Sequence, residues 1–279
     1  MIIVEPMGGL GNRMRVIASG IWLRAQLQTK LIIVWNENYE LNCPFDCLFE
    51  QSDLFTIRKK NIWHRYLRSN YQQTALLRFW AKLINGLAGV SFCVDEADFP
   101  VQLPRGSADL YAVAHRFKNI YIRTCREFGD NQSALESFQP VEEIALRVAE
   151  VARQFNEYTI GIHIRQTDNL PSVQYSPVRL FVSAMQEALA KQAATNFFVC
   201  SDDLQVKRDM VALFGDRVIT SLSPTARDST AGIVDAAAEL YCLSTTRWIF
   251  GSYYSSYGEI AARIGHVELK VLKETGKDE

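Results

Sequence analysis

An arginine at the end of an apolar segment is the residue of this chain best suited to bind an anion. The stretch YTIGIHIR, residues 158–165, has the pattern of a buried strand and ends at Arg165. A buried guanidinium is costly unless an anion accompanies it, and its fork of N–H donors matches the oxygens of a diphosphate. A salt bridge to Asp168 or to another acid is the ordinary alternative, and Arg165 alone does not decide between the two.

A serine-rich turn offers a second place for an anion. The segment GSYYSSYGEIA, residues 251–261, joins a predicted strand to a predicted helix. Ser256 and Glu259 have the spacing of a capping box, which predicts that Ser256 caps the helix. The amides of a helix N-terminus also favour a phosphate. The two interpretations are compatible, because Ser252 and Ser255 can bind the phosphate while Ser256 caps.

Three acidic residues are candidates for contacts to a nucleobase or a ribose. Asp235 and Glu239 lie four residues apart, on one face of a predicted helix, where like charges repel each other slightly. Asp202, in the triplet SDD, follows a predicted strand. Each has an ordinary alternative: a solvated surface for the first two, and a helix cap for the acids of the triplet.

The segment MGGLGNRMR, residues 7–15, is a glycine-rich loop that matches neither familiar phosphate loop. It lacks the Lys-Ser or Lys-Thr pair of a P-loop, and Met14 stands where a dinucleotide fingerprint needs a small residue. The glycines Gly8, Gly9 and Gly11 either make a tight turn before a helix that Asn12 caps, or bring backbone amides and the side chains of this loop to a ligand. In the second case Asn12, Arg13 and Arg15 supply the side chains that contact the ligand.

The C-terminal half shows alternating strands and helices, which predicts a parallel sheet with crossover connections. We expect a five-stranded Rossmann-like domain, in which ligands bind beyond the carboxyl ends of the strands, in the loops after Arg165, Cys200, Ser221 and Gly251. The helix over 176–192 is expected to begin with Ser176 as cap and Pro177 at its first position. The predicted strands are 158–165, 196–201, 217–221, 247–252 and 267–272, and the other predicted helices are 142–155, 204–215, 230–244 and 256–265.

The N-terminal half also begins with a strand (1–5), a helix (12–28) and a second strand (30–35), whereas residues 37–125 are less regular. Within it, residues 58–82 contain seven Lys and Arg, no acid and five aromatic residues. We interpret this stretch as a helix with a solvated face. Contact with an anionic acceptor or a membrane surface is the alternative. The change between domains falls near 140–156, and we assign 1–150 and 151–279.

Composition excludes several classes of protein. The formal net charge of −1 argues against general nucleic-acid binding. The six cysteines have no paired spacing and are not grouped with histidines, which predicts free thiols in a reducing cytoplasm rather than a zinc site. Neither a signal peptide nor an apolar run of about 18 residues is present. The sequence therefore predicts a cytoplasmic protein, with peripheral membrane contact through 58–82 as an additional hypothesis.

Taken in order, three motifs resemble the GDP-fucose-dependent fucosyltransferase superfamily, which comprises α1,2- and α1,6-fucosyltransferases and protein O-fucosyltransferases. They are GGLGNRM, GIHIRQTD and AELYCLSTTRWIFGSYYSSYGEIAA, and the lead-in STAGIVDAAAELYCLS is similar to bacterial members. Together they cover about a quarter of the chain, and residues 37–125 show no match. The resemblance implies an α/β GT-B-like architecture, in which two Rossmann-like domains with parallel sheets face each other across a cleft.

By resemblance, the nucleotide sugar binds residues 151–279 and the acceptor side is 1–150. Arg165 would grip the β-phosphate and stabilise the departing GDP. The residues expected at the nucleotide sugar are His163, Asp202, Asp235, Glu239, Ser252, Ser255 and Ser256, with Glu239 or Asp235 near guanine. The residues expected at the sugar or acceptor are Gly9, Gly11, Asn12 and Arg13. Two departures stand out: Gln166 occupies a position where many relatives carry a second arginine, and the C-terminal domain is short.

The resulting prediction is an inverting, metal-independent glycosyltransferase that transfers fucose from GDP-fucose to a glycan or glycolipid acceptor, without a cofactor. Two alternatives remain: a transferase of the same fold that uses another nucleotide sugar, and a non-catalytic nucleotide-binding protein. Asp168 and Glu5 are the candidates for a general base.

Overall fold

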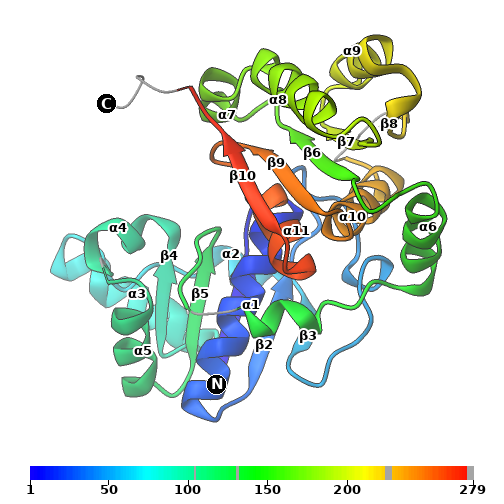
Figure 1. The fold of residues 1–279 in the computed structure, drawn as a ribbon. Coiled ribbons are helices and arrows are strands. Elements are labelled where there is room, and N and C mark those ends of the chain that lie inside the picture. Colours follow the sequence, from blue (N-terminus) through cyan, green and yellow to red (C-terminus); the bar gives the residue numbers. More distant parts are fainter. Residues whose placement is uncertain (104, 130–131, 224–227, 275–279) are drawn as a thin grey trace. The chain divides into compact units, whose positions relative to one another are not determined.

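The computed structural model describes residues 1–103, 105–129, 132–223 and 228–274, and the chain divides into two compact units, Met1–Gln139 and Pro140–Glu279 (Figure 1). Each unit contains one parallel five-stranded sheet with helices between its strands. The α/β class predicted from the sequence is thereby confirmed.

The first unit is built on a sheet of order β3-β2-β1-β5-β4. Its first strands, β1 and β2, are almost entirely buried, as expected for apolar strands of a parallel sheet covered on both faces. The strands are β1 (Ile2–Pro6), β2 (Leu31–Trp35), β3 (Thr56–Lys59), β4 (Phe92–Asp95) and β5 (Ile120–Thr124). The helices are α1 (Leu10–Leu27), α2 (Ile62–Tyr66), α3 (Ala75–Leu87), α4 (Phe99–Gln102) and α5 (Ser107–Arg116), with short 3₁₀ segments η1 (Phe45–Cys47), η2 (Glu96–Asp98) and η3 (Ser133–Ser137).

Two predictions for this unit need correction. Helix α1 begins at Leu10 with Gly9 as its N-cap, so Asn12 lies inside the helix and does not cap it. Residues 58–82 form the end of β3, the helix α2 and the first part of α3 rather than one helix. The chain is interrupted there because Asn61 and Thr74 each cap a new helix, by accepting hydrogen bonds from the amides of His64 and Leu77.

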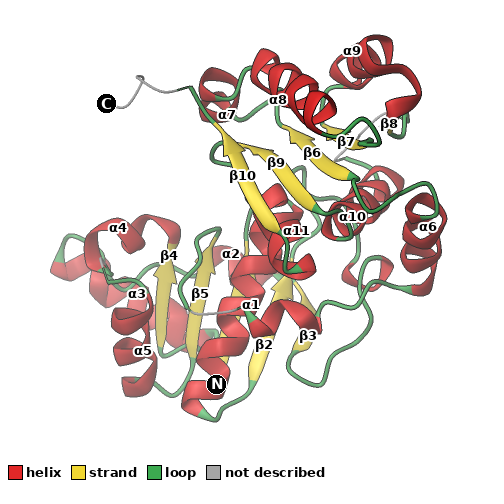
Figure 2. Cartoon of the chain, viewed as in Figure 1, coloured by secondary structure: helices red, strands yellow, loops and turns green. Residues whose placement is uncertain are grey.

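The second unit has the sheet order β10-β9-β6-β7-β8. Helices α7, α8 and α9 lie on one side of this sheet and α10 and α11 on the other (Figure 2). The strands are β6 (Ile160–Ile164), β7 (Phe197–Ser201), β8 (Val218–Ile219), β9 (Trp248–Ser252) and β10 (Glu268–Leu272). The helices are α6 (Glu142–Ala152), α7 (Leu170–Tyr175), α8 (Val178–Lys191), α9 (Leu204–Phe214), α10 (Thr230–Ser244) and α11 (Ser256–Gly265), with the 3₁₀ segment η4 (Gly215–Arg217).

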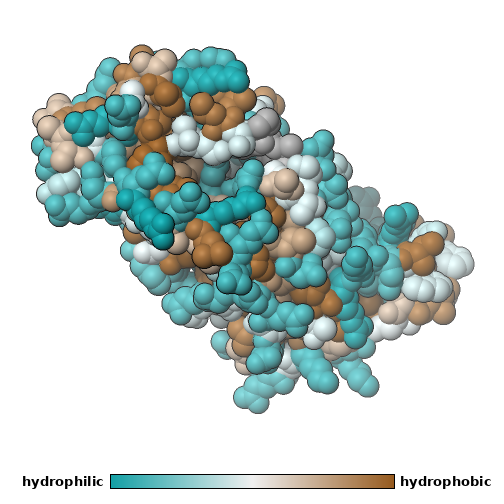
Figure 3. Space-filling model, turned by 90° about the vertical axis from the view of Figure 1, so that its right-hand side faces the viewer, coloured by the Kyte–Doolittle hydropathy of each residue, from teal (hydrophilic) through white to brown (hydrophobic). Residues whose placement is uncertain are grey.

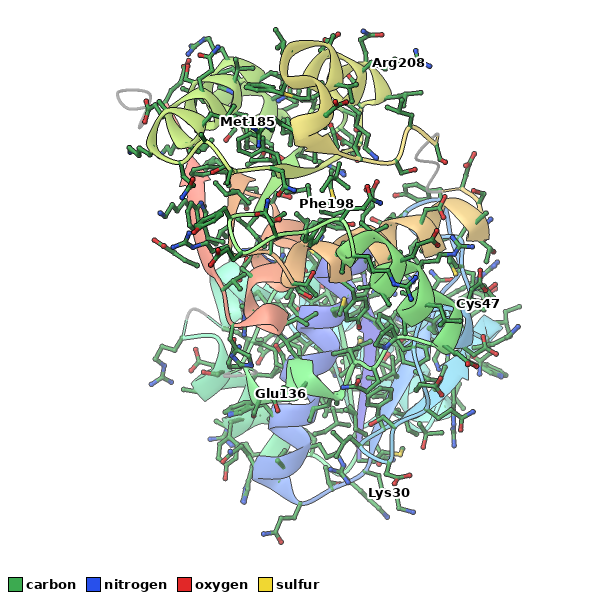
Figure 4. The ribbon with its side chains drawn as sticks, turned by 45° about the vertical axis from the view of Figure 1, so that its right-hand side comes forward. Lys30, Cys47, Glu136, Met185, Phe198 and Arg208 are labelled. Atoms are coloured by element: carbon green, nitrogen blue, oxygen red, sulfur yellow. The ribbon has the colours of Figure 1, made fainter. Side chains whose placement is uncertain are left out.

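Strand β6 separates two packed layers of this unit. Its isoleucines pack with Phe181 and Met185 of α8, and Figure 4 shows Met185 pointing from α8 toward the strands. On the other side of the sheet, a Cβ on Gly161 would lie within 3 Å of the Leu243 and Thr246 side chains, so α10 packs directly on the strand. Helix α6 packs against α10 as part of this unit.

Most elements predicted for the second unit are present, and the differences lie at helix starts. Helix α8 begins at Val178 with Pro177 as its N-cap, and the buried Ser176 instead binds the amide of Tyr253 and the carbonyl of Leu272. Helix α11 has Ser255 as its N-cap without a side-chain bond, so the predicted capping box at Ser256 is wrong. Helix α7, read as loop from the sequence, was missed.

Polar side chains remain at the surface around these cores. On the face of the molecule drawn in Figure 3, hydrophilic residues form most of the surface and hydrophobic residues lie in patches between them. The central strands β1, β2, β6 and β7, by contrast, are buried over almost all of their length. The loops that follow these strands therefore start from packed parts of the two sheets.

Candidate functional site

The order of the second sheet places its ligand-binding edge between β6 and β9. From β6 the chain runs to β7 and β8 on one side, and then returns to β9 on the other side of β6. Such a reversal point opens a crevice beyond the carboxyl ends of the strands. Arg165 follows β6 and Ser252 ends β9, and the amide of Arg165 donates a hydrogen bond of 3.0 Å to the Ser252 hydroxyl. The structure thus joins the two predicted anion-binding segments.

Two carboxylates hold the Arg165 side chain, which is 18% exposed. Its Nε lies 3.1 Å from Asp202, and its Nη2 binds Asp168, whose side chain is 57% exposed. Asp202 also accepts the amides of Gln166 at 2.8 Å and Thr167 at 3.3 Å. Asp202 therefore fixes both the loop after β6 and the direction of the guanidinium, and the salt bridge considered from the sequence is present.

The three serines of the segment 251–261 differ in their exposure to solvent. Ser252 is buried, and its hydroxyl contacts the carbonyl of His163 in addition to the amide of Arg165. These contacts position the start of the loop after β6, and the phosphate contact expected of Ser252 stays a prediction. Ser255 and Ser256 are partly exposed at the N-terminus of α11, where a helix favours an anion.

The loop that carries these serines is held in an unusual backbone conformation. Tyr254 has a φ of 56°, a left-handed conformation that non-glycine residues adopt only when neighbouring structure imposes it. The Asn169 amide group donates to the Tyr254 carbonyl at 2.8 Å, and the Ser172 hydroxyl donates to the Tyr253 carbonyl at 2.6 Å. The loop after β9 is therefore shaped by the loop and helix that follow β6.

His163 lies beneath this edge and is neutral. It stacks on Tyr257 with ring centroids 4.9 Å apart, and its Nδ1 has no hydrogen-bond partner among the described residues. Burial, together with the charge of Arg165, lowers the pKa of His163 to about 4. An uncharged imidazole in this position leaves Arg165 as the cation at the end of the strand.

The pH dependence of stability tests this state of His163. In the unfolded chain the imidazole takes up a proton below about pH 6.5, whereas in the folded chain it does so only near pH 4. Stability is therefore lost as pH falls between these two values. Urea unfolding at pH 7 and pH 5 should show that the wild type loses about 2 kcal/mol more than the His163→Phe variant. Equal losses in both proteins would mean that folding does not lower the pKa of His163.

The acids expected near a nucleobase are both paired. Asp235 forms an ion pair with Arg147 of α6, and Glu239 lies 2.5 Å from the ammonium of Lys207, which is fully buried in α9. Burial raises the pKa of Glu239. Their contacts to a nucleotide stay predictions. Lys207 was missed, although its place one helical turn before Met210 on the apolar side of α9 was a readable signal.

In the first unit, the glycine loop owes its shape to Gly8. This residue has a φ of +80° and its amide donates to Glu40 at 3.1 Å. Arg13 is completely buried, and its guanidinium donates to the carbonyls of Gly8 and Asn36 and to the side chain of Asn38. The Nε, Nη1 and Nη2 atoms of Arg13 each donate to the protein itself, which assigns it a structural role here, and its expected ligand contact stays a prediction. The contacts expected of Gly9, Gly11 and Asn12 stay predictions.

Gly8 and Gly9 form a matched pair for mutation. A Cβ on Gly8 would lie 2.6 Å from the Asn12 side-chain nitrogen, in a backbone conformation that L residues avoid, whereas a Cβ on Gly9 meets nothing within 4 Å. Gly8→Ala should lower the free energy of unfolding by about 1–2 kcal/mol. Gly9→Ala should change it by less than about 0.5 kcal/mol. Urea unfolding of both variants measures the difference, and equal values would contradict the conformation assigned to Gly8.

Glu5, one of the two candidate bases, is buried, and both of its carboxylate oxygens accept hydrogen bonds. One carboxylate oxygen accepts the ammonium of Lys60 at 2.6 Å, and the other accepts the Tyr121 hydroxyl at 2.6 Å. Asp168 is the more accessible candidate.

All six cysteines are free thiols. Among the described residues, no three His, Cys, Asp or Glu side chains gather as a metal site would require. Within the same ranges, every helix is too short or too polar to cross a bilayer.

Comparison with known proteins gives matches in structure rather than in sequence. No protein-family model and no curated protein sequence matches this chain. The structure of the α1,6-fucosyltransferase NodZ, known from Bradyrhizobium and soaked with GDP-fucose, superposes with a TM-score of 0.64 at 17% identity, covering 94% of this chain and 92% of NodZ.

Two further structures extend the match. A variant of Arabidopsis thaliana FUT1 in complex with GDP gives a TM-score of 0.63 at 14% identity, covering 96% of this chain and 69% of that one. POFUT1 in complex with GDP-fucose gives 0.58 at 12% identity, covering 96% and 95%. The chain therefore has the GT-B-like fold of fucosyltransferase structures, which confirms, at the level of the fold, the resemblance that its motifs indicated.

Proposed function

We propose that this protein is a glycosyltransferase that transfers fucose from GDP-fucose to a glycan or glycolipid acceptor, with inversion and without a metal or cofactor. The observation that carries the proposal is the position of Arg165: its guanidinium stands at the reversal point between β6 and β9, where Ser252 binds its amide. The fold around it is that of structures that contain GDP-fucose.

The chemistry follows from the leaving group. An acceptor hydroxyl oxygen attacks C1 of fucose, the bond from C1 to the β-phosphate oxygen breaks, and its electron pair leaves with GDP. Negative charge therefore grows on the diphosphate, and preorganised donors that meet this charge lower the barrier. Arg165 and the N-terminus of α11, with the hydroxyls of Ser255 and Ser256, supply such donors. A single displacement inverts the anomeric centre.

The acceptor proton requires a base, and Asp168 fits this role better than Glu5. In the structure Asp168 binds Nη2 of Arg165, and Asp202 holds Nε from another side. A diphosphate oxygen can replace Asp168 at Nη2 while Asp202 keeps the guanidinium in place. The displaced carboxylate of Asp168 then lies beside the donor phosphate and accepts the proton of the acceptor hydroxyl.

The remaining assignments are parts of the same proposal. Asp235, whose side chain is 37% exposed, is the more accessible of the two candidate acids for guanine, and Glu239 is the second. Free thiols, four of them buried and two partly buried, fit a reducing cytoplasm. No nucleic-acid partner is expected, because the formal net charge is −1.

Calorimetry with GDP, GMP, UDP and ADP in EDTA tests the choice of donor. GDP should bind most tightly, and GMP should bind more weakly because it lacks the β-phosphate that Arg165 would hold. A preference for UDP or ADP would overturn the assignment to GDP-fucose. If none of the four nucleotides binds, the proposal of a nucleotide-sugar enzyme fails.

One observation favours a second candidate, a nucleotide-binding protein without transferase activity. Gln166 supplies no cation beside Arg165, and its side chain donates to the carbonyl of Ser176 at 3.1 Å. GDP binding without any turnover of GDP-fucose, in the presence of acceptor glycans, would support this candidate.

A further inference from the structure

Helix α3 presents its apolar side to solvent. Leu76, Trp80, Leu83 and Leu87 recur at the spacing of a single helical stripe and are each 45 to 74% exposed. Leu77 and Phe79 widen this surface. On an ordinary helix of a soluble protein these positions are polar, so the pattern is inverted. We call this set of six residues the α3 stripe.

The opposite side of α3 fixes the helix to its unit. Ala81 and Asn85 are buried, and the Asn85 side chain exchanges hydrogen bonds with the backbone of Arg68 at 3.1 and 2.8 Å. Asn85 also donates to the Asn70 side chain at 3.0 Å. Since the helix is held through these residues, its exposed stripe is a fixed feature of the surface.

The segment of the chain that contains α3 carries only positive charges. Residues 54–94 contain seven Lys and Arg and no Asp or Glu, although the whole chain has a formal net charge of −1. Arg65, Arg78 and Lys82 form no ion pair with any described residue. Arg78 and Lys82 also line a cavity of about 660 Å³ beside α3, together with Tyr71 and the stacked rings of Phe92 and Phe117.

Exposed aromatic residues also lie in α2, the helix that precedes α3 in the chain. Trp63 and Tyr66 of α2 are each more than half exposed. Tryptophan and tyrosine favour the boundary between lipid headgroups and acyl chains. An apolar helical side with aromatic residues and surrounding cations is the pattern of a helix that lies in the plane of a membrane surface.

We propose that α3 is a membrane-docking helix for an anionic bilayer. The α3 stripe enters the boundary between headgroups and acyl chains, and Arg78 and Lys82 bind lipid phosphates, one of which occupies the cavity beside them. A helix of 13 residues is about 20 Å long, so it lies along the surface and does not cross the bilayer. The inference does not depend on the donor or on the transfer reaction.

A second copy of the chain and a nucleic acid each fit the α3 surface less well than an anionic bilayer. A second copy of the chain would bring the cations Arg65, Arg78 and Lys82 of one copy close to the same residues of the other. Nucleic acid fits the cations and can stack on Phe79 and Trp80, but it leaves the four leucines of the stripe without an apolar partner. An anionic bilayer satisfies both the leucines and the cations.

Vesicle flotation of the full chain tests the proposal. We expect binding to phosphatidylcholine vesicles that contain phosphatidylglycerol, weaker binding as salt rises, and little binding to phosphatidylcholine alone. The double variant Arg78→Gln/Lys82→Gln should bind about thirtyfold more weakly, since each cation near an anionic surface contributes about a fivefold factor. Trp80→Ser/Leu83→Ser should lose at least about tenfold through the buried apolar area.

Matched controls come from the second unit, where Leu213, Arg208 and Lys191 are exposed. Leu213→Ser and Lys191→Gln/Arg208→Gln should bind vesicles as the wild type does, and all variants should unfold at the same temperature. No binding of the wild type to anionic vesicles, or equal loss in variants and controls, would overturn the proposal. Concentration-dependent dimers that Trp80→Ser/Leu83→Ser dissociates, without vesicle binding, would assign the stripe to a second copy instead.

Discussion

Replacing Arg165 by alanine should lower the rate of GDP release from GDP-fucose by about 10²–10³-fold, the usual effect of removing one donor from a preorganised anion clamp. The side chain stands at the reversal point of the second sheet, where Asp202 fixes its Nε. Affinity for GDP should fall as well, because the departing diphosphate loses its two-point partner. Steady-state kinetics give kcat and KM, and calorimetry gives the affinity.

Two variants sharpen this experiment. Arg208→Ala removes an arginine that points from α9 into solvent (Figure 4), and it should leave both rate and affinity unchanged. Arg165→Lys keeps the charge but not the fork, so it should recover only part of the rate. If Arg165→Ala retained the full rate while remaining folded, the charge on the diphosphate would have to be met elsewhere, and the proposed clamp would be wrong.

Replacing Arg13 by alanine should lower the free energy of unfolding by about 3–5 kcal/mol. The variant leaves the carbonyls of Gly8 and Asn36 and the side chain of Asn38 without their donor, in a buried place. It also removes a cation that lies 4.8 Å over the Trp35 ring. Burial lowers the pKa of Arg13 to about 10, so the lost group is charged at neutral pH.

Chemical unfolding measures this loss, with Arg24→Ala as the control on the same helix. Arg24 lies in the last turn of α1 and is partly exposed, so its removal should cost less than about 0.5 kcal/mol. A small effect of Arg13→Ala, with a large effect on ligand binding, would support the ligand-contact role predicted from the sequence.

The second unit was predictable because its elements are long and regular. Each predicted strand from 158–165 to 267–272 has a counterpart in the sheet, and each predicted helix begins or ends within a few residues of the observed one. The first residues of the helices were harder to predict, because several neighbouring residues are each suitable as the N-cap. At α11, Ser255 takes the position expected for Ser256. At α1, Gly9 precedes the predicted cap Asn12 by three residues.

The secondary structure of residues 37–125 could not be predicted, because several of its helices are very short. The positions at which these helices begin are set by individual capping side chains. Helix α2 has five residues and α4 has four, too few to establish a helical period. The apolar stripe of α3 was readable, but its direction was not. Periodicity shows that Leu76 and Leu83 share a face, and only the anchoring of Asn85 shows that this face is the outer one.

The geometry of the candidate site was predictable where it depends on position along one strand. It was not predictable where it depends on the order of the strands in the sheet. Arg165 follows from the pattern of residues 158–165, whereas the role of Asp202 requires that β7 lie beside β6. The role of Ser252 likewise requires β9 on the other side. The structural contacts of Arg13 could not be predicted, because its partners Asn36 and Asn38 lie more than 20 residues along the chain.

The most direct test of the proposed function is release of GDP from GDP-fucose by the wild type in EDTA, with acceptor glycans present. GDP-mannose and a UDP-sugar serve as competing donors. We expect turnover of GDP-fucose, no loss of rate in EDTA, and a rate about 10²–10³-fold lower for Arg165→Ala. Turnover of another donor in preference to GDP-fucose, or dependence of the rate on a divalent metal, would contradict the account.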